Sequence, residues 1–129
     1  MYHIAGVLIT GGNPSHNTAE LYVPSSGVSC DLPLLPDYRY FHTVSAGGLI
    51  CGGYEYDTGN SCIMWSPESG YWHEALTLDA RRSGHVSWTP SSGNTGIYLM
   101  GGSPGYTDRA TLIKNDRSQE QAFPLKYDA

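Results

Sequence analysis

Three adjacent glycine pairs divide the chain into units of similar length, and this repetition restricts the fold more than any other feature. Each pair ends a short apolar run, and the pairs start 41 and 49 residues apart; they are Gly11-Gly12, Gly52-Gly53 and Gly101-Gly102. A period of roughly 40–50 residues with several short apolar segments per unit is typical of propeller blades, each of which is one small sheet. The sequence therefore predicts a repeat protein.

Two further landmarks recur in the same order. Residues 22–27, Tyr-Val-Pro-Ser-Ser-Gly, match residues 65–70, Trp-Ser-Pro-Glu-Ser-Gly, at an offset of 43. An Arg-x-x-His pattern repeats at that same offset and consists of Arg39 with His42 and Arg82 with His85. Three independent landmarks with one order and nearly one spacing are not expected by chance.

These residues resemble the kelch repeat. That repeat combines an Arg-x-x-His turn, two apolar strands of which the second ends in Gly-Gly, a Tyr-x-Pro-like strand and a Trp-bearing strand. The resemblance covers nearly the whole chain, with Trp72 in the tryptophan position of the middle unit, Ser29 in that of the first, and Asn115-Asp116 replacing the proline landmark of the third. It implies a kelch-type β-propeller of four-stranded antiparallel sheets.

Composition agrees with an all-β chain, because 16 Gly, 8 Pro and 10 Tyr among 129 residues favour short strands and tight turns. We expect strands near residues 5–10, 19–23, 28–31, 42–46, 48–52, 62–66, 72–76, 85–89, 96–101, 110–114 and 120–125. This pattern predicts a partial blade at 1–35 that lacks its inner strand, followed by blades at 36–80 and 81–129. Because propellers close with about 4–8 blades, we expect an incomplete propeller, covered by the remaining blades of a larger protein or by self-association.

The repeated landmarks are predicted to be structural. Glycine pairs suit crowded strands near a propeller axis because they lack a Cβ atom. A phosphate cradle is the alternative, but such a cradle opens a helix and no helical pattern follows. Arg39 and Arg82 are interpreted as hydrogen-bond donors between blades, with a substrate-binding arginine as the alternative.

The remaining landmarks have similar pairs of interpretations. We expect His42 and His85 to form a hydrogen bond inside each blade, because repetition favours that role over a shared metal. The sequence shows no converging His, Cys and carboxylate spacing, so it predicts neither a metal nor a cofactor. Trp72 is expected to pack between blades, with ligand stacking as the alternative.

The three cysteines bear on the cellular compartment. Cys51 ends one expected strand and Cys62 begins the next, and antiparallel neighbours place such positions nearly opposite. We therefore predict a Cys51–Cys62 disulfide, with Cys30 bonded to a cysteine outside this sequence. A disulfide favours an extracellular location. Three buried free thiols, as in a cytoplasmic protein, are the alternative.

Charge and hydropathy exclude two classes of partner. Seven basic and 12 acidic side chains give a net charge of −5, whereas nucleic-acid binding requires a basic face. No apolar run approaches the roughly 18 residues that a membrane helix needs, so no membrane span is expected.

The loops after the glycine pairs differ completely in sequence, unlike the repeated landmarks. Variable loops on a repeated frame carry recognition in such scaffolds. We therefore predict a non-catalytic module that binds a protein or glycan at the loop rim, with contacts from Tyr54, Tyr56, Tyr106 and Arg109. Loops that only solubilise the rim are an equal alternative.

An enzyme resembling galactose oxidase is the second class of function. That resemblance implies a copper site of Tyr and His with a Tyr–Cys crosslink, and no residue set in this sequence matches it. A carboxylate pair at Glu55 and Asp57 is a further catalytic alternative to solvated loop charges. The sequence therefore favours binding over catalysis.

Overall fold

The computed structural model describes residues 6–12, 17–45, 48–54, 59–66, 68–90, 96–102 and 109–124, with only the backbone described at 109 and 122–124. The regular structure in these ranges is entirely β-strand, and none of it is a helix suited to crossing a membrane. The chain is therefore all-β, as its composition predicts.

Within the described ranges, eleven strands form three antiparallel sheets, and neighbours in sequence are neighbours in each sheet. The first sheet comprises β1 (Val7–Thr10), β2 (Ala19–Val23) and β3 (Val28–Asp31). The second comprises β4 (Thr43–Ser45), β5 (Leu49–Cys51), β6 (Ser61–Ser66) and β7 (Tyr71–Thr77). The third comprises β8 (Val86–Trp88), β9 (Ile97–Met100), β10 (Arg109–Ile113) and β11 (Gln119–Pro124). The expected three strands followed by two sets of four are confirmed.

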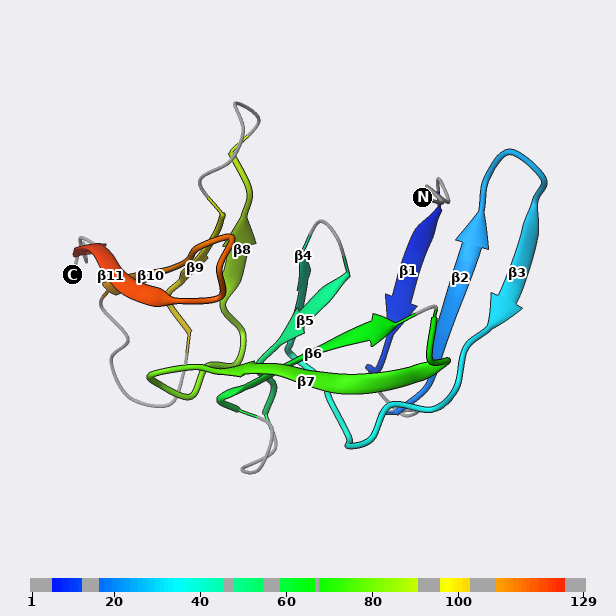
Figure 1. Ribbon diagram of the computed structural model, residues 1–129, viewed down its shortest axis with the longest axis horizontal. Coiled ribbons are helices and arrows are strands. Elements are labelled where there is room, and N and C mark those ends of the chain that lie inside the picture. Colours follow the sequence, from blue (N-terminus) through cyan, green and yellow to red (C-terminus); the bar gives the residue numbers. More distant parts are fainter. Residues whose placement is uncertain are drawn as a thin grey trace.

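The three sheets lie in a row, with the second between the other two (Figure 1). Side chains alternate between the two faces of a strand, and β5 is buried throughout. Its residue Ile50 belongs to the core shared with the first sheet, whereas Leu49 and Cys51 belong to the core shared with the third. A strand buried on both faces requires a continuous apolar run, which explains the Leu-Ile-Cys sequence.

Trp72 on β7 connects the second sheet to the chain that follows the first. Its ring packs against the core of Ala19, Leu35, Ile50 and Ile63, and its Nε1 donates a hydrogen bond to the Pro33 carbonyl oxygen at 2.9 Å. The indole therefore contributes apolar area to the space between two sheets while its polar atom is satisfied at the edge.

The repeated proline–glycine landmark forms the same turn in the first and second sheets. Gly27 donates its N–H to the Val23 carbonyl, and Gly70 donates to the Ser66 carbonyl, each at 2.9 Å. Both glycines have positive φ, 71° and 76°, which strains residues that carry a Cβ. The glycine that ends each landmark is therefore required by the turn.

Cys51 and Cys62 are joined by a disulfide, as the sequence predicts. They are direct partners in the β5–β6 register, and their Cα atoms are 4.2 Å apart. Both lie in the core between the second and third sheets. Cys30 is a free thiol and is exposed, so the alternative of three buried free thiols is wrong.

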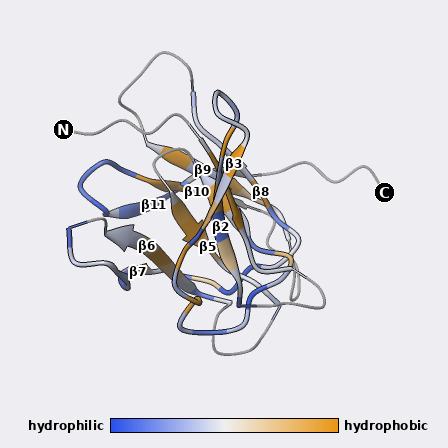
Figure 2. Cartoon of the chain, turned by 90° about the vertical axis from the view of Figure 1, so that its right-hand side faces the viewer, coloured by the Kyte–Doolittle hydropathy of each residue, from blue (hydrophilic) through white to orange (hydrophobic). Residues whose placement is uncertain are grey.

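The outer faces of the first and third sheets leave large apolar side chains exposed. On the first sheet these are Val7, Ile9 and Tyr22, and on the third they are Val86 and Trp88. Figure 2, viewed from the side of the first sheet, shows that apolar residues are concentrated on the strands. The row of sheets thus presents an uncovered apolar face at each end.

Removing the disulfide is expected to destabilise the fold. The chain-entropy relation for a sequence separation of 11 gives about 3 kcal/mol of unfolding free energy for the Cys51→Ala, Cys62→Ala double variant. Urea denaturation of this variant measures the loss. The matched control is Cys30→Ala, which should change stability by less than about 0.5 kcal/mol because Cys30 is exposed. Alkylation of all three cysteines without prior reduction would contradict the disulfide.

The uncovered faces are expected to make the isolated chain self-associate, because exposed apolar faces and unpaired strand edges favour association. Sedimentation velocity should show a mass above the monomer that falls with dilution. The double variant Ile9→Lys, Trp88→Lys should shift the population toward monomer, whereas Tyr71→Lys, at an exposed position on β7, should not. A concentration-independent monomer for the parent chain would disprove this expectation.

Candidate functional site

The guanidinium of Arg39 is completely buried beside the glycine pair of the second sheet. Its Nη1 donates to the carbonyl oxygens of Gly52 at 3.0 Å and Ser61 at 2.8 Å. Its Nε donates to the carboxylate of Asp37 at 2.8 Å, which balances the buried charge. Arg39 therefore binds the two strand ends, after β5 and at the start of β6, that meet next to Gly52.

Arg82 repeats this arrangement in the third sheet. Its Nη1 donates to the carbonyl oxygen of Gly101, and its Nη2 donates to the Thr111 hydroxyl, each at 2.8 Å. Gly101 follows β9 as Gly52 follows β5, whereas Thr111 lies opposite Leu99, the position that Ile63 holds opposite Ile50 in the second sheet. In both units the arginine thus binds the carbonyl of the first glycine of the pair.

The main chain of each arginine contacts the preceding sheet. The Arg39 carbonyl accepts a hydrogen bond from Gly12 N–H, and the Arg82 carbonyl accepts one from Gly53 N–H, each at 2.9 Å. The repeated Arg-x-x-His pattern predicts guanidinium groups that donate between units. In the structure the guanidinium binds the glycine pair of its own unit, and the carbonyl binds that of the preceding unit.

This close approach explains the first glycine of the pair in the second sheet. A Cβ atom on Gly52 would overlap the Arg82 carbonyl oxygen and lie 2.7 Å from Cε1 of His85. Gly52 also has a φ of 73°, in the left-handed region. Both space and backbone conformation therefore require glycine at this position.

The two landmark histidines connect sheets instead of bonding within one sheet. His42 Nε2 is hydrogen-bonded to the Thr10 hydroxyl at 2.8 Å, and His85 Nε2 to the Thr43 hydroxyl at 2.9 Å. Each threonine belongs to the preceding sheet. The expected bond inside each blade is wrong because each histidine precedes the first strand of its sheet, where the adjacent sheet approaches closely.

Burial favours the neutral form of both imidazoles. It lowers the pKa of His42, with a further contribution from the positive charge of Arg39. It lowers the pKa of His85 to about 4, and the neighbouring Arg82 and His42 add to the effect. The Nδ1 atoms of both rings are buried, with no hydrogen-bond partner in the described part of the chain. Two such rings stabilise the packing of sheets only while they are uncharged.

Three aromatic rings form an exposed group beside these buried side chains. We call Tyr40, Phe41 and Tyr54 the aromatic cluster. The ring centroid of Tyr40 lies 5.2 Å from that of Phe41 and 5.1 Å from that of Tyr54. The centroids of Phe41 and Tyr54 are 6.2 Å apart. Phe41 and Tyr54 are each 62% exposed. The cluster therefore offers a contiguous aromatic surface to a partner.

The backbone holds the cluster in place. Tyr54 N–H donates to the Tyr40 carbonyl at 2.9 Å, and Gly84 N–H donates to the Phe41 carbonyl at 2.8 Å. Phe41 has a φ of 59°, a left-handed conformation that is unusual for a bulky residue. Such strain costs about 1–3 kcal/mol and is concentrated at functional sites.

The repeat shows what the backbone alone requires at Phe41. The residue at the same place in the next Arg-x-x-His segment is Gly84, with a φ of 65°. Gly84 satisfies this conformation without strain. The repeated backbone conformation therefore does not explain why position 41 carries a large exposed ring.

The structure tests the predicted contact residues unevenly. Tyr54 lies in the aromatic cluster, whereas Tyr56 and Tyr106 lie outside the described residues. The backbone of Arg109 begins β10, but its side chain is outside the described part. Tyr40 and Phe41 were not predicted, although the contrast between Tyr-Phe and Ser-Gly inside the two Arg-x-x-His segments is visible in the sequence.

Neither a metal-binding group nor a similar known protein indicates a function for this chain. Within the described ranges, no group of three or more His, Cys, Asp and Glu side chains is arranged to hold a metal ion. A scan against protein-family models gives no match for this chain, and a search of curated proteins gives no significant match. The resemblance to the kelch repeat stays a prediction that depends on the repeated landmarks.

Acidification is expected to destabilise the fold through His85. Its folded-state pKa of about 4 lies below the ordinary value of 6.5, so the unfolded chain binds more protons between these values. The stabilising effect of neutral His85 is therefore complete above about pH 6.5 and is lost as the pH falls toward 4. The expected slope approaches about 1.4 kcal/mol per pH unit, and His42 adds to it in the same direction.

Urea denaturation from pH 4.5 to 7.5 measures this slope. The His85→Asn variant should be less stable at pH 7 and show a shallower dependence on pH. The solvent-exposed control His73→Asn should keep the slope of the parent chain. An NMR titration midpoint for His85 near 6.5 would contradict the prediction.

Proposed function

We propose that this chain is a non-catalytic recognition module built from kelch-type propeller blades, and that its aromatic cluster contacts a protein or glycan ligand. The observation that carries the proposal is Phe41, a large exposed side chain in the left-handed conformation that Gly84 adopts at the equivalent position. Strain of this kind persists where the side chain serves a purpose.

The blade assignment is supported by repetition in space as well as in sequence. Each four-stranded sheet carries one buried arginine on its glycine pair, and each arginine carbonyl binds the preceding sheet. In a propeller, further blades of the same kind would cover the apolar outer faces at Val7, Ile9, Val86 and Trp88.

The aromatic cluster suits recognition for two physical reasons. Tyr and Phe rings provide a large contact area, and they lose little conformational entropy when they dock. The tyrosine hydroxyls add hydrogen bonds to peptide or sugar groups at the edge of that area. Tyr54 follows Gly53 directly, so the cluster lies where the variable loop containing Tyr56 begins.

The disulfide supports an extracellular setting for this module. Disulfides persist in oxidising compartments and are rare in reducing ones. Cys51–Cys62 lies within the core, where it joins the two central strands of the second sheet. The proposed ligand is accordingly a protein or glycan of the extracellular space.

The Phe41→Gly variant tests the proposal sharply. Glycine relieves the left-handed strain, so the melting temperature should be equal to or above that of the parent chain, while ligand binding should be lost. Binding to glycans is measured on an oligosaccharide array. Binding to proteins is measured by photo-crosslinking from a photoreactive amino acid placed at position 54. Tyr54→Ala should weaken the same interaction by about tenfold or more.

Tyr71→Ala is the matched control, because Tyr71 is 71% exposed on β7 and lies outside the cluster. It should leave binding unchanged. Equal effects of Tyr54→Ala and Tyr71→Ala, or full binding by Phe41→Gly, would disprove a role for the cluster. Tyr56→Ala, Tyr106→Ala and Arg109→Ala, measured in parallel, show whether the adjoining loops take part.

A further inference from the structure

A cavity of about 180 Å³ lies between the second and third sheets, away from the aromatic cluster. Its apolar lining comes from both sheets and consists of Leu49, Met64, Ile97 and Ile113. Its polar lining comes from the turn between β10 and β11 and consists of Lys114, Asn115 and Arg117. One part of the cavity is thus suited to apolar atoms and the other to an anion.

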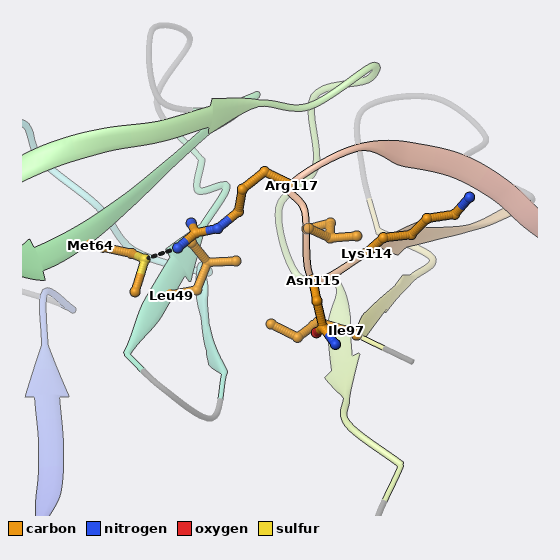
Figure 3. Close-up of a pocket in the computed structure, with 8 residues that line it drawn as sticks. Leu49, Met64, Ile97, Lys114, Asn115 and Arg117 are labelled. Atoms are coloured by element: carbon orange, nitrogen blue, oxygen red, sulfur yellow. Dashed lines mark hydrogen bonds between the residues drawn. The ribbon is translucent and has the colours of Figure 1, made fainter. Parts of the chain in front are cut away.

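Arg117 reaches across this cavity to the second sheet. Figure 3 shows its side chain extending toward Met64 and Leu49, and its Nη2 donates to Met64 Sδ at 2.8 Å. A thioether sulfur is a weak acceptor for a charged guanidinium. The Arg117 side chain is exposed, and among the described residues it has no carboxylate partner.

Lys114 on the same turn, unlike Arg117, has a carboxylate partner. Its Nζ lies 3.2 Å from the carboxylate of Glu120, and its side chain extends away from Met64 and Leu49 (Figure 3). The positive charge of Lys114 is therefore balanced within the protein. Of the two cations among the described residues that line the cavity, Arg117 is the one available to a ligand.

We propose that the cavity binds a small carboxylate that carries an apolar group, such as an aromatic carboxylate. The carboxylate would accept paired hydrogen bonds from Arg117 in place of the weak bond to Met64, because guanidinium and carboxylate match in geometry. The apolar group would contact Leu49, Ile97 and Ile113. A cavity of about 150 Å³ accommodates benzene, so a volume of about 180 Å³ is sufficient for a ligand near the size of benzoate.

Three probes separate charge from apolar contact. Benzoate has both features, benzyl alcohol lacks the charge and acetate lacks the ring. NMR titration of the full 129-residue chain should show saturable shifts at Leu49, Ile97 and Ile113 with benzoate. Benzyl alcohol and acetate should each bind about tenfold more weakly or not at all. Equal binding of benzoate and either probe, or no binding of benzoate, overturns the proposal.

Variants then assign the binding to Arg117. Arg117→Gln should weaken benzoate binding about tenfold, and Arg117→Lys should have an intermediate effect because it keeps the charge but loses the paired geometry. Arg81→Gln removes the same charge next to Gly59, outside the cavity, and should leave binding unchanged. Ile97→Phe should abolish binding by filling the space, with the spectrum of the free chain showing that the fold is kept. Benzoate binding that is unaffected by Arg117→Gln overturns the proposed site.

Discussion

The hydrogen bonds between each buried arginine and the glycine pairs are the interaction on which the rest of the structure depends. The guanidinium of Arg39 binds the carbonyls of Gly52 and Ser61, and its own carbonyl binds the N–H of Gly12 in the preceding sheet. Arg82 repeats this pattern one sheet further on. A Cβ atom on Gly52 would overlap the Arg82 carbonyl oxygen, whereas Gly12 has space for a Cβ atom but a φ of 98°, which strains residues that carry one. Arginine and glycine therefore recur together where adjacent sheets meet.

Stacking of sheets on this frame determines where the core lies. The second sheet is covered on both faces, so Ile50 and its neighbours Leu49 and Cys51 pack in opposite directions and all are buried. The first and third sheets are covered on one face only, which leaves Ile9 and Trp88 exposed. The same geometry that stabilises the centre of the row thus leaves its two ends dependent on further apolar cover.

Each of the two proposed sites depends on a residue that differs from the repeat pattern. Phe41 keeps the left-handed backbone of its counterpart Gly84 but adds an exposed ring, so the frame stays intact while the surface changes. Arg117 extends from the turn between β10 and β11 into the space between two sheets, where its guanidinium meets the sulfur of Met64. Both residues hold a left-handed backbone conformation, with φ of 59° and 73°, which is costly for a residue that carries a Cβ atom.

The sequence by itself determined the strands, the three repeat units and the Cys51–Cys62 pair. These features depend on local apolar runs, turn residues and period, which are legible along the chain. Only the tertiary structure decided which groups meet across sheets, such as His85 with Thr43, 42 residues apart, and Arg117 with Met64, 53 residues apart. It also gathered Tyr40, Phe41 and Tyr54 into one surface, of which sequence reasoning predicted only Tyr54. Contacts of this kind depend on how sheets stack and turn relative to one another, and no local pattern encodes that geometry.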